Sequence, residues 1–259
     1  MVRACVLFAA GTNCDEEAVR ALELAGACAE TVHINRLLSR DVRLADYQLA
    51  VLPGGFSYGD YIASGRILAG ELIHHLRDEL TEFRAAGKPV LGICNGFQVL
   101  AKSGLLPAFE RPFEPQSVTL DTNDSGRYED RWVHLRVEST PCIFTHGIDP
   151  IIYLPVAHAE GKFLAKDAPT LARLKMNHQA VLRYVTAAGE QAQYPDNPNG
   201  SEDGIAGICD PSGLVFGLMP HPERFVRREH HPQWQRLSSV RIDGIGIFKN
   251  AVNHVKDHL

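Results

Sequence analysis

One cysteine, Cys94, stands in the stretch GICNG (residues 92–96), with a glycine two positions away on each side. The apolar run at 89–93 predicts a buried strand, and residues 95–101 have the apolar spacing of a helix. A G-x-nucleophile-x-G pattern between a strand and a helix is typical of a tight elbow that lifts a nucleophile above the sheet edge. Unpaired N–H groups at a helix start also favour a thiolate. The stretch therefore predicts a reactive thiol.

The histidine best placed to serve this thiol is His221, in the segment MPHPER (residues 219–224) after an apolar run. Two prolines restrict the backbone and are expected to keep it extended, so that side chains two positions apart point the same way. The Glu223 side chain then either points into the same site as His221 or orients the His221 imidazole. A thiol nucleophile needs a base and an acid that orients the base. Cys94, His221 and Glu223 supply these three parts.

Two plainer interpretations compete with this triad. A histidine is most often a solvated surface residue, which fits His74 and His75 better than His221 between its prolines. A metal site is the other alternative, but no H-x-x-x-H or Cys/His ligand spacing lies near this segment. We therefore expect no metal.

A glycine-rich loop, PGGFSYGD (residues 53–60), follows another predicted strand. In an open parallel sheet, ligands bind at the carboxyl ends of the strands. The loop can be a plain turn, and it lacks the pattern of a phosphate-binding loop. An acyl-transfer site also needs hydrogen-bond donors for the oxyanion. We expect these donors to be the backbone N–H of Asn95 and one from Gly54-Gly55.

The order of the strands and helices expected around these residues predicts an α/β fold with a doubly wound, mostly parallel open sheet. Strands are expected at 4–10, 30–35, 47–53 and 89–93, and helices at 15–25, 67–86 and 95–101. After residue 104, short strands are expected at 118–121, 132–138, 151–156, 181–185, 205–209 and 214–218, before a helix at 242–255. We expect this second half to add antiparallel strands to the same sheet. No linker is visible, so residues 1–259 are predicted to form one domain.

Composition limits the remaining possibilities. The 259 residues are 45% hydrophobic and 22% charged, with a formal net charge of −5 and no basic cluster. This argues against a nucleic acid or an anionic membrane as partner. No apolar run approaches the ~18 residues of a membrane span.

The six cysteines form no C-x-x-C pair, and the chain starts without a secretory signal, so we expect reduced thiols in the cytoplasm. A free cysteine is usually a packing residue. We interpret Cys5, Cys28, Cys142 and Cys209 in that way.

The elbow GICNGFQ, the loop PGGFSYGD and the segment MPHPER together resemble the class I glutamine amidotransferases, which have a flavodoxin-like sheet and a Cys-His-Glu triad. With GTNCDEE, RWVHLRVE, VAHAEGKF and NPNGSEDGIAGI, the chain most resembles the glutaminase subunits of phosphoribosylformylglycinamidine synthase. The resemblance implies that Cys94 is the nucleophile, His221 the base and Glu223 its orienting acid. It also implies that Gly55 and Asn95 form the oxyanion hole. Gln98 is implied to lie near the substrate glutamine.

The resemblance also implies a reaction and partners. Glutamine is hydrolysed through a cysteine thioester, and the ammonia passes to a separate ATP-dependent synthetase subunit of de novo purine biosynthesis, so that the pair acts as a carbon–nitrogen ligase. ATP and magnesium are expected on that partner, with no cofactor on this chain. A small bridging subunit is expected as well. Two departures are Ile62-Ala63, where the family has Leu-Arg, and a longer segment at 227–243.

Three alternatives remain at this stage. The chain can be a class I glutaminase of another biosynthetic pathway, which would keep the triad and change the partner. It can be a cysteine hydrolase of related fold, although this leaves His221-Pro222-Glu223 without a role. It can also be an inactive docking subunit, which the presence of all three triad residues disfavours.

Overall fold

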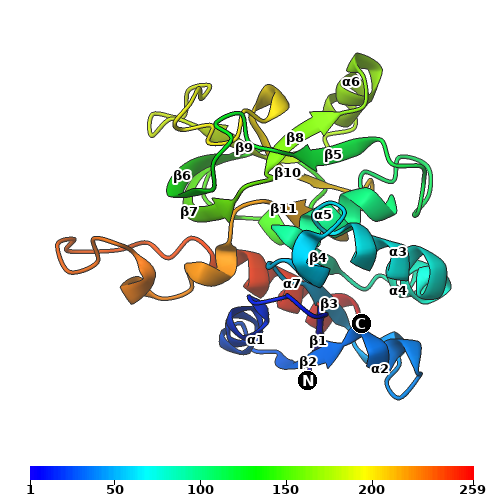
Figure 1. The fold of residues 1–259 in the computed structure, drawn as a ribbon. Helices are drawn as coiled ribbons and strands as arrows, with labels where there is room; N and C mark the ends of the chain where they lie inside the picture. Colours follow the sequence, from blue (N-terminus) through cyan, green and yellow to red (C-terminus); the bar gives the residue numbers. More distant parts are fainter.

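The computed structural model describes all 259 residues, with helices and strands alternating up to residue 103 and mostly strands from 118 to 218 (Figure 1). The strands are β1 Arg3–Phe8, β2 Cys28–His33, β3 Leu49–Leu52, β4 Val90–Ile93, β5 Val118–Asp121, β6 Glu129–Val137, β7 Ile151–His158, β8 Lys162–Ala165, β9 Ala180–Val185, β10 Ile205–Cys209 and β11 Val215–Leu218. The helices are α1 Asp15–Leu24, α2 Ile34–Leu38, α3 Arg66–His75, α4 Arg77–Ala85, α5 Asn95–Ser103, α6 Ala168–Met176 and α7 Ile245–His258.

Nine strands form the central sheet, in the order β2-β1-β3-β4-β11-β10-β9-β6-β7. The neighbours from β2 to β11 pair in parallel, and β10, β9, β6 and β7 extend the sheet by antiparallel pairing. Successive strands are added on one side of β1 to reach β2 and on the other side to reach β3 and β4, so right-handed crossovers place α1 on one face of the sheet and α3 on the other. Accordingly, α1 contacts α7, whereas α3 contacts α5. The expected doubly wound, mostly parallel sheet with added antiparallel strands is confirmed.

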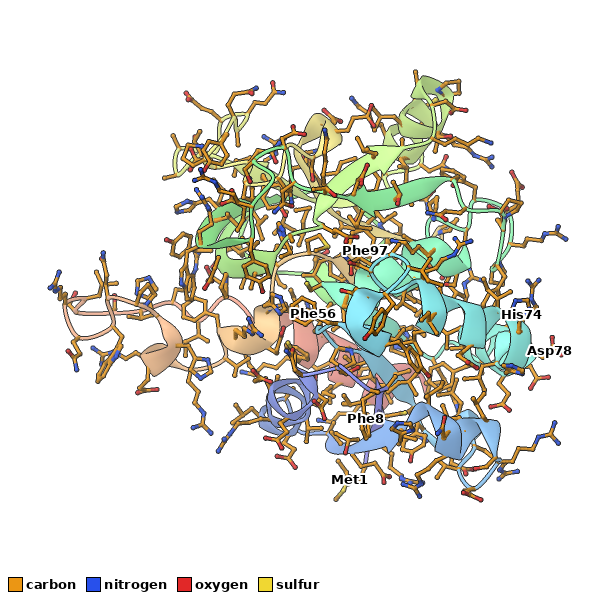
Figure 2. All side chains as sticks on the ribbon, viewed as in Figure 1. Met1, Phe8, Phe56, His74, Asp78 and Phe97 are labelled. Carbon is orange, nitrogen blue, oxygen red and sulfur yellow. The ribbon has the colours of Figure 1, made fainter.

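The centre of the sheet is apolar because its short strands are covered on both faces. All four residues of β3, of β4 and of β11 are buried, as expected of parallel strands between helical layers. A single hydrophobic cluster of 66 buried residues includes these strands. Phe97 of α5 lies inside, whereas His74 and Asp78 on α3 and α4 point outward (Figure 2). The surface interpretation of His74 is therefore confirmed.

Two expectations about the second half were wrong. Strand β11 was expected to be antiparallel, but it pairs in parallel with β4 and antiparallel with β10. Strand β5 was expected in the main sheet, but it pairs with β8 in a separate two-stranded sheet. Pairing partners depend on contacts between distant segments, which the local alternation of apolar residues does not encode.

Other differences concern element boundaries. The expected helix at 67–86 is two helices, because Leu76 leaves helical geometry at φ −120° and ψ 11°. Leu72, Leu76 and Leu80 stay buried at a spacing of four, so the apolar pattern runs through the break. Helix α2 was missed; it starts where the His33 ring accepts a hydrogen bond from the Asn35 N–H. Strand β8 and helix α6 were also missed.

The long segment 227–243 projects from the body of the molecule (Figure 1, orange). Its inner end is anchored by His231, whose ring lies 5.5 Å from that of Trp132. Its C-terminal end is anchored as well, because Asp243, which is paired with Arg241, accepts a hydrogen bond from the Tyr153 N–H of β7. None of the helices combines the length and apolar character that a membrane span would need.

Candidate active site

The cysteine elbow expected from the sequence is present between β4 and α5. Cys94 has φ 51° and ψ −105°, a strained conformation for a residue with a side chain. The flanking glycines leave room for it: a Cβ on Gly92 would lie 2.5 Å from a Leu100 methyl, and one on Gly96 would lie 1.9 Å from the Leu52 carbonyl oxygen. The elbow therefore cannot accept larger residues at either position.

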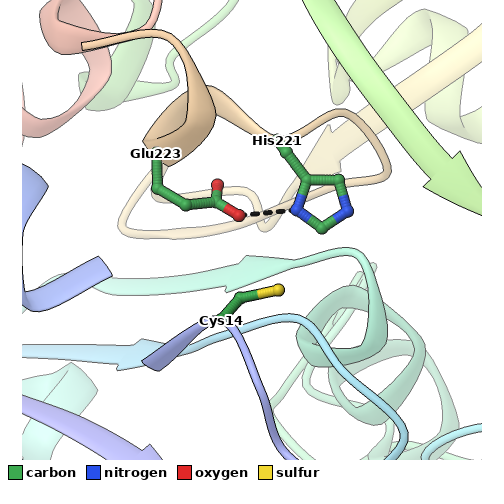
Figure 3. A group of neighbouring side chains, drawn as sticks. All are labelled: Cys14, His221 and Glu223. Carbon is green, nitrogen blue, oxygen red and sulfur yellow. Dashed lines mark hydrogen bonds and ion pairs between the residues drawn. The ribbon is translucent and has the colours of Figure 1, made fainter. Parts of the chain in front are cut away.

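His221 and Glu223 form a buried pair (Figure 3). The His221 Nδ1 lies 2.5 Å from the Glu223 Oε1, and the two residues are 2% and 1% exposed. They do not lie on an extended segment as expected, because Pro222–Arg224 form one 3₁₀ turn. The turn brings the Glu223 carboxylate back to the His221 ring. Of the two expected arrangements, the structure therefore has the one in which Glu223 orients the imidazole.

The charge on His221 follows from these neighbours. Burial alone would lower the pKa of His221, but the Glu223 carboxylate and the Cys94 sulfur raise this pKa well above its ordinary value. The Nδ1 proton points to Glu223, and the buried Nε2 has no hydrogen-bond partner in the protein. An unpaired buried nitrogen is costly unless a substrate or the nucleophile meets it. This nitrogen is therefore free to exchange a proton in the pocket.

The pocket at the elbow has a volume of about 250 Å³ and brings together most of the expected site residues. Cys94, His221, Gly55 and Gln98 all line it. Gly54 lies just behind, where a Cβ would come within 2.8 Å of the His221 Cε1 and 3.5 Å of the Cys94 Cβ.

The glycine loop is held in place by the segment that follows β1. The Gly54 carbonyl accepts hydrogen bonds from the N–H groups of Asn13 and Cys14. Gly55 adopts φ 139°, and its N–H is bound to no acceptor in the protein. As the first residue of α5, Asn95 also lacks an acceptor within the helix for its N–H. These are the two donors expected for an oxyanion, and that role stays a prediction.

The side chains of Asn95 and Gln98 are engaged with the protein. The Asn95 amide donates to the Gln98 Oε1 at 2.9 Å, and its carbonyl accepts from the Ser57 N–H at 3.2 Å. The Gln98 amide donates to the Glu160 carbonyl oxygen at 2.6 Å. Gln98 thus joins the elbow helix to the loop after β7. Its expected place near the substrate agrees with its position in the pocket and stays a prediction.

Sequence reasoning missed several residues of this pocket. Cys14, which had no role, is 1% exposed and lines it together with Tyr128, His158 and Arg224. Cys14 follows β1 at the same edge of the sheet as the glycine loop, and this placement was the available signal. In contrast, Cys28, which was interpreted as a packing residue, is exposed at the start of β2.

Cys14, His221 and Glu223 offer ligand atoms within 4.8 Å of one another (Figure 3). This cluster is nevertheless a poor cation site. Glu223 is already bonded to the His221 ring, and the Arg224 guanidinium donates to the Cys14 sulfur at 3.0 Å. A positive group at that distance repels a metal ion. That the chain holds no metal stays a prediction.

A second buried histidine, His158 on β7, predicts how stability depends on pH. Burial, with the charge of His221 beside it, lowers the pKa of His158 to about 3. Between pH ~6.5 and 3 the histidine binds a proton in the unfolded chain but not in the folded one, so the free energy of unfolding falls as the pH falls through this range. At pH 5 the free energy of unfolding has fallen by about 2 kcal/mol through His158 alone, at ~1.4 kcal/mol per pH unit. His158→Gln should therefore lose less stability than the parent between pH 7 and pH 5 in urea unfolding. Equal losses of unfolding free energy in the parent and the variant would contradict the lowered pKa of His158.

Comparison with known proteins agrees with this geometry. Residues 1–255 match the model of the CobB/CobQ-like glutamine amidotransferase domain. The phosphoribosylformylglycinamidine synthase subunit PurQ of Dehalococcoides mccartyi is 46% identical over 97% of this chain and 96% of its own. The same subunit of Methanococcus maripaludis is 41% identical over 96% of each chain.

Solved structures lead to the same family. A chain from the structure of PurLQS from Thermotoga maritima matches with a TM-score of 0.75 and 35% identity, over 98% of this chain and 99% of that one. Another glutamine amidotransferase from Thermotoga maritima matches with a TM-score of 0.52 at 16% identity, over 98% of each chain, which supports the fold alone. The chain therefore belongs to the glutamine amidotransferases and, within them, to the PurQ glutaminase subunits of phosphoribosylformylglycinamidine synthase.

Proposed function

We propose that this chain hydrolyses the side-chain amide of glutamine at Cys94 and passes the ammonia to a separate ATP-dependent synthetase subunit. One observation carries the assignment of residues. A cysteine on a strained elbow shares a pocket with a histidine whose Nδ1 is bound to a buried glutamate and whose Nε2 is unpaired. These are the parts that an acyl transfer through a thiol requires.

The first half of the reaction follows from the charges of the site. With its pKa raised, His221 carries a proton on Nε2, which favours a thiolate on Cys94. The thiolate attacks the amide carbon of glutamine, and the N–H groups of Gly55 and Asn95 stabilise the oxyanion that forms. Each such donor contributes on the order of 3 kcal/mol. His221 then gives its proton to the leaving nitrogen, so that ammonia departs and a thioester remains on Cys94.

The second half uses the same groups in the opposite sense. Neutral His221 takes a proton from water as the water oxygen adds to the thioester carbon. Collapse of this intermediate breaks the carbon–sulfur bond, releases glutamate and returns the thiolate beside a protonated His221. Glu223 holds the ring in one orientation throughout, since its carboxylate stays bonded to Nδ1.

The partners we propose follow from the family. The synthetase subunit would bind ATP and magnesium and convert formylglycinamide ribonucleotide to its amidine, and a small subunit would bridge the two proteins. The solved relative, PurLQS, carries three components in its name, which supports such an assembly. This chain would bind glutamine and no cofactor. A mechanism that depends on a free thiol at Cys94 agrees with a reducing compartment such as the cytoplasm.

Glutamine hydrolysis with and without the synthetase tests the proposal. We expect one glutamate per amidine when the purified chain, the synthetase, ATP and formylglycinamide ribonucleotide are combined, measured by chromatography. A thioester on Cys94 should be trapped by acid quench and detected by mass spectrometry. Amidine formation from glutamine without this chain, or a thioester on another cysteine, would overturn the proposal.

A further inference from the structure

Cys14 connects the segment after β1 to the glycine loop of the active site. It is 1% exposed, and its backbone N–H donates to the Gly54 carbonyl at 3.2 Å. Its thiol donates to the Asn13 Oδ1, also at 3.2 Å. The residue has no part in the proposed reaction, yet its sulfur lies at the wall of the pocket.

Arg224 connects the same sulfur to the turn that carries His221 and Glu223. Its Nη2 donates to the Cys14 sulfur at 3.0 Å. Burial opposes the charge of Arg224, but the Cys14 sulfur and the Glu223 carboxylate raise its pKa. Its contact with Glu17 is longer, at 4.0 Å, and partly exposed, so it contributes little. The sulfur is therefore the main anchor of this guanidinium.

The two connections meet at the imidazole. The Cys14 sulfur, a His221 nitrogen and a Glu223 oxygen lie within 4.8 Å of one another, with the sulfur next to the bonded pair (Figure 3). On Gly54 a Cβ would lie 2.8 Å from the His221 ring and 3.1 Å from the Cys14 sulfur. The His221 Nε2, buried and unpaired, can meet Cys94 and the substrate only if the ring keeps this place.

We propose that Cys14 and Arg224 are positioning residues: their hydrogen bond, here called the latch, holds the histidine turn against the glycine loop. This inference rests on the proposed function and deepens it. The backbone of the turn is tied to β7, because the His221 N–H donates to the Pro155 carbonyl at 2.8 Å. The latch fixes the other side of the turn. It thereby sets the distance between the general acid on one segment and the oxyanion donor on the other.

Replacing either partner should lower turnover more than binding. Cys14→Ala and Arg224→Met should each reduce kcat for glutamine hydrolysis about 10- to 100-fold, because small displacements of catalytic groups are costly. KM should change by less than about threefold, since the hydrogen bond is proposed to position His221 and not to hold glutamine. Cys14→Ser should restore much of kcat, because a hydroxyl can still accept from Arg224 and donate to Asn13.

A double variant separates a latch from two unrelated defects. If the two residues act through one bond, Cys14→Ala with Arg224→Met should lower kcat about as much as either change alone. If the double variant instead loses the product of the two single fold-changes in kcat, the two residues act independently and the proposed latch is wrong. Cys142→Ala is the matched control, because Cys142 is equally buried outside the pocket. It should lower the melting temperature while leaving kcat and its pH profile unchanged.

The pH profile gives a readout that a structural role would not move. The titratable and charged groups that face His221 are Glu223 and Arg224 in its own turn, Cys94 at the elbow, Cys14 before α1, His158 on β7 and Tyr128. Of these, Cys14 helps raise the pKa of His221. In Cys14→Ala the alkaline limb of the kcat profile should therefore shift to lower pH. An unshifted limb with unchanged kcat in folded protein would overturn the proposal.

The two proposals fail in different ways. A parent protein that hydrolyses no glutamine in the complex would overturn the proposed function, whatever the variants do. An active parent whose Cys14→Ala and Arg224→Met variants keep kcat and the pH profile would overturn the latch alone. Circular dichroism of each variant shows whether it has folded. If Cys14→Ala does not fold, the comparison of Cys14→Ser with Arg224→Met still decides the question, since only the second removes the bond.

Discussion

Cys94→Ala should abolish glutamine-dependent amidine formation and leave ammonia-dependent synthesis by the complex intact. The variant has no sulfur to form the thioester, so glutamine hydrolysis should fall at least about 10⁴-fold. The synthetase subunit would still accept ammonia from solution. Both rates are measured on the same purified complex, with glutamine or with an ammonium salt as nitrogen donor.

The matched control for this change is Cys28→Ala. That thiol is exposed at the start of β2, away from the pocket, and its loss should alter neither rate. If Cys94→Ala lost the ammonia-dependent rate as well, the division of labour between the two subunits would be wrong. If it kept the glutamine-dependent rate, Cys94 would not be the nucleophile.

Glu223→Gln should have the second largest effect. An amide in place of the carboxylate cannot stabilise a protonated ring and can hold the wrong tautomer, so kcat should fall about 10³- to 10⁴-fold. The pH profile should change as well. Glu223 keeps the pKa of His221 high against the effect of burial, and without it burial lowers that pKa. The His221 Nε2 proton is then lost at lower pH, so the alkaline limb of the kcat profile of the remaining activity shifts to lower pH.

Glu190→Gln is a suitable control, because Glu190 is exposed in a loop outside the pocket. It should leave both kcat and the pH profile unchanged. Retained activity in Glu223→Gln, or an alkaline limb at the parent's position, would show that Glu223 does not act on His221.

The sequence located the elbow and the glycine loop because both depend on local chemistry. A tight strand-to-helix turn needs glycine on both sides of Cys94, and this requirement is visible in five residues. The parallel half of the sheet was also predictable, since short apolar strands alternate there with amphipathic helices.

What the sequence did not reveal depends on contacts between distant segments. Cys14 and Arg224 are 210 residues apart, and no local pattern links them. The pairing of β11 with β4, and of β5 with β8, likewise joins segments that look like ordinary strands. The 3₁₀ turn at Pro222–Arg224 was missed for a different reason, because prolines are compatible with both an extended segment and the start of a helical turn.

The direct pairing of β4 with β11 has a consequence for biosynthesis of the protein itself. Ile93 pairs with Leu218, and the Cys94 N–H donates to the Leu218 carbonyl, so the nucleophile and the base leave the sheet on adjacent strands. On the ribosome, Cys94 emerges more than a hundred residues before His221. A nascent or truncated chain therefore holds a thiol with no proton donor beside it. Such a fragment is not expected to hydrolyse glutamine, and the capacity to release ammonia arises only when β11 has paired with β4.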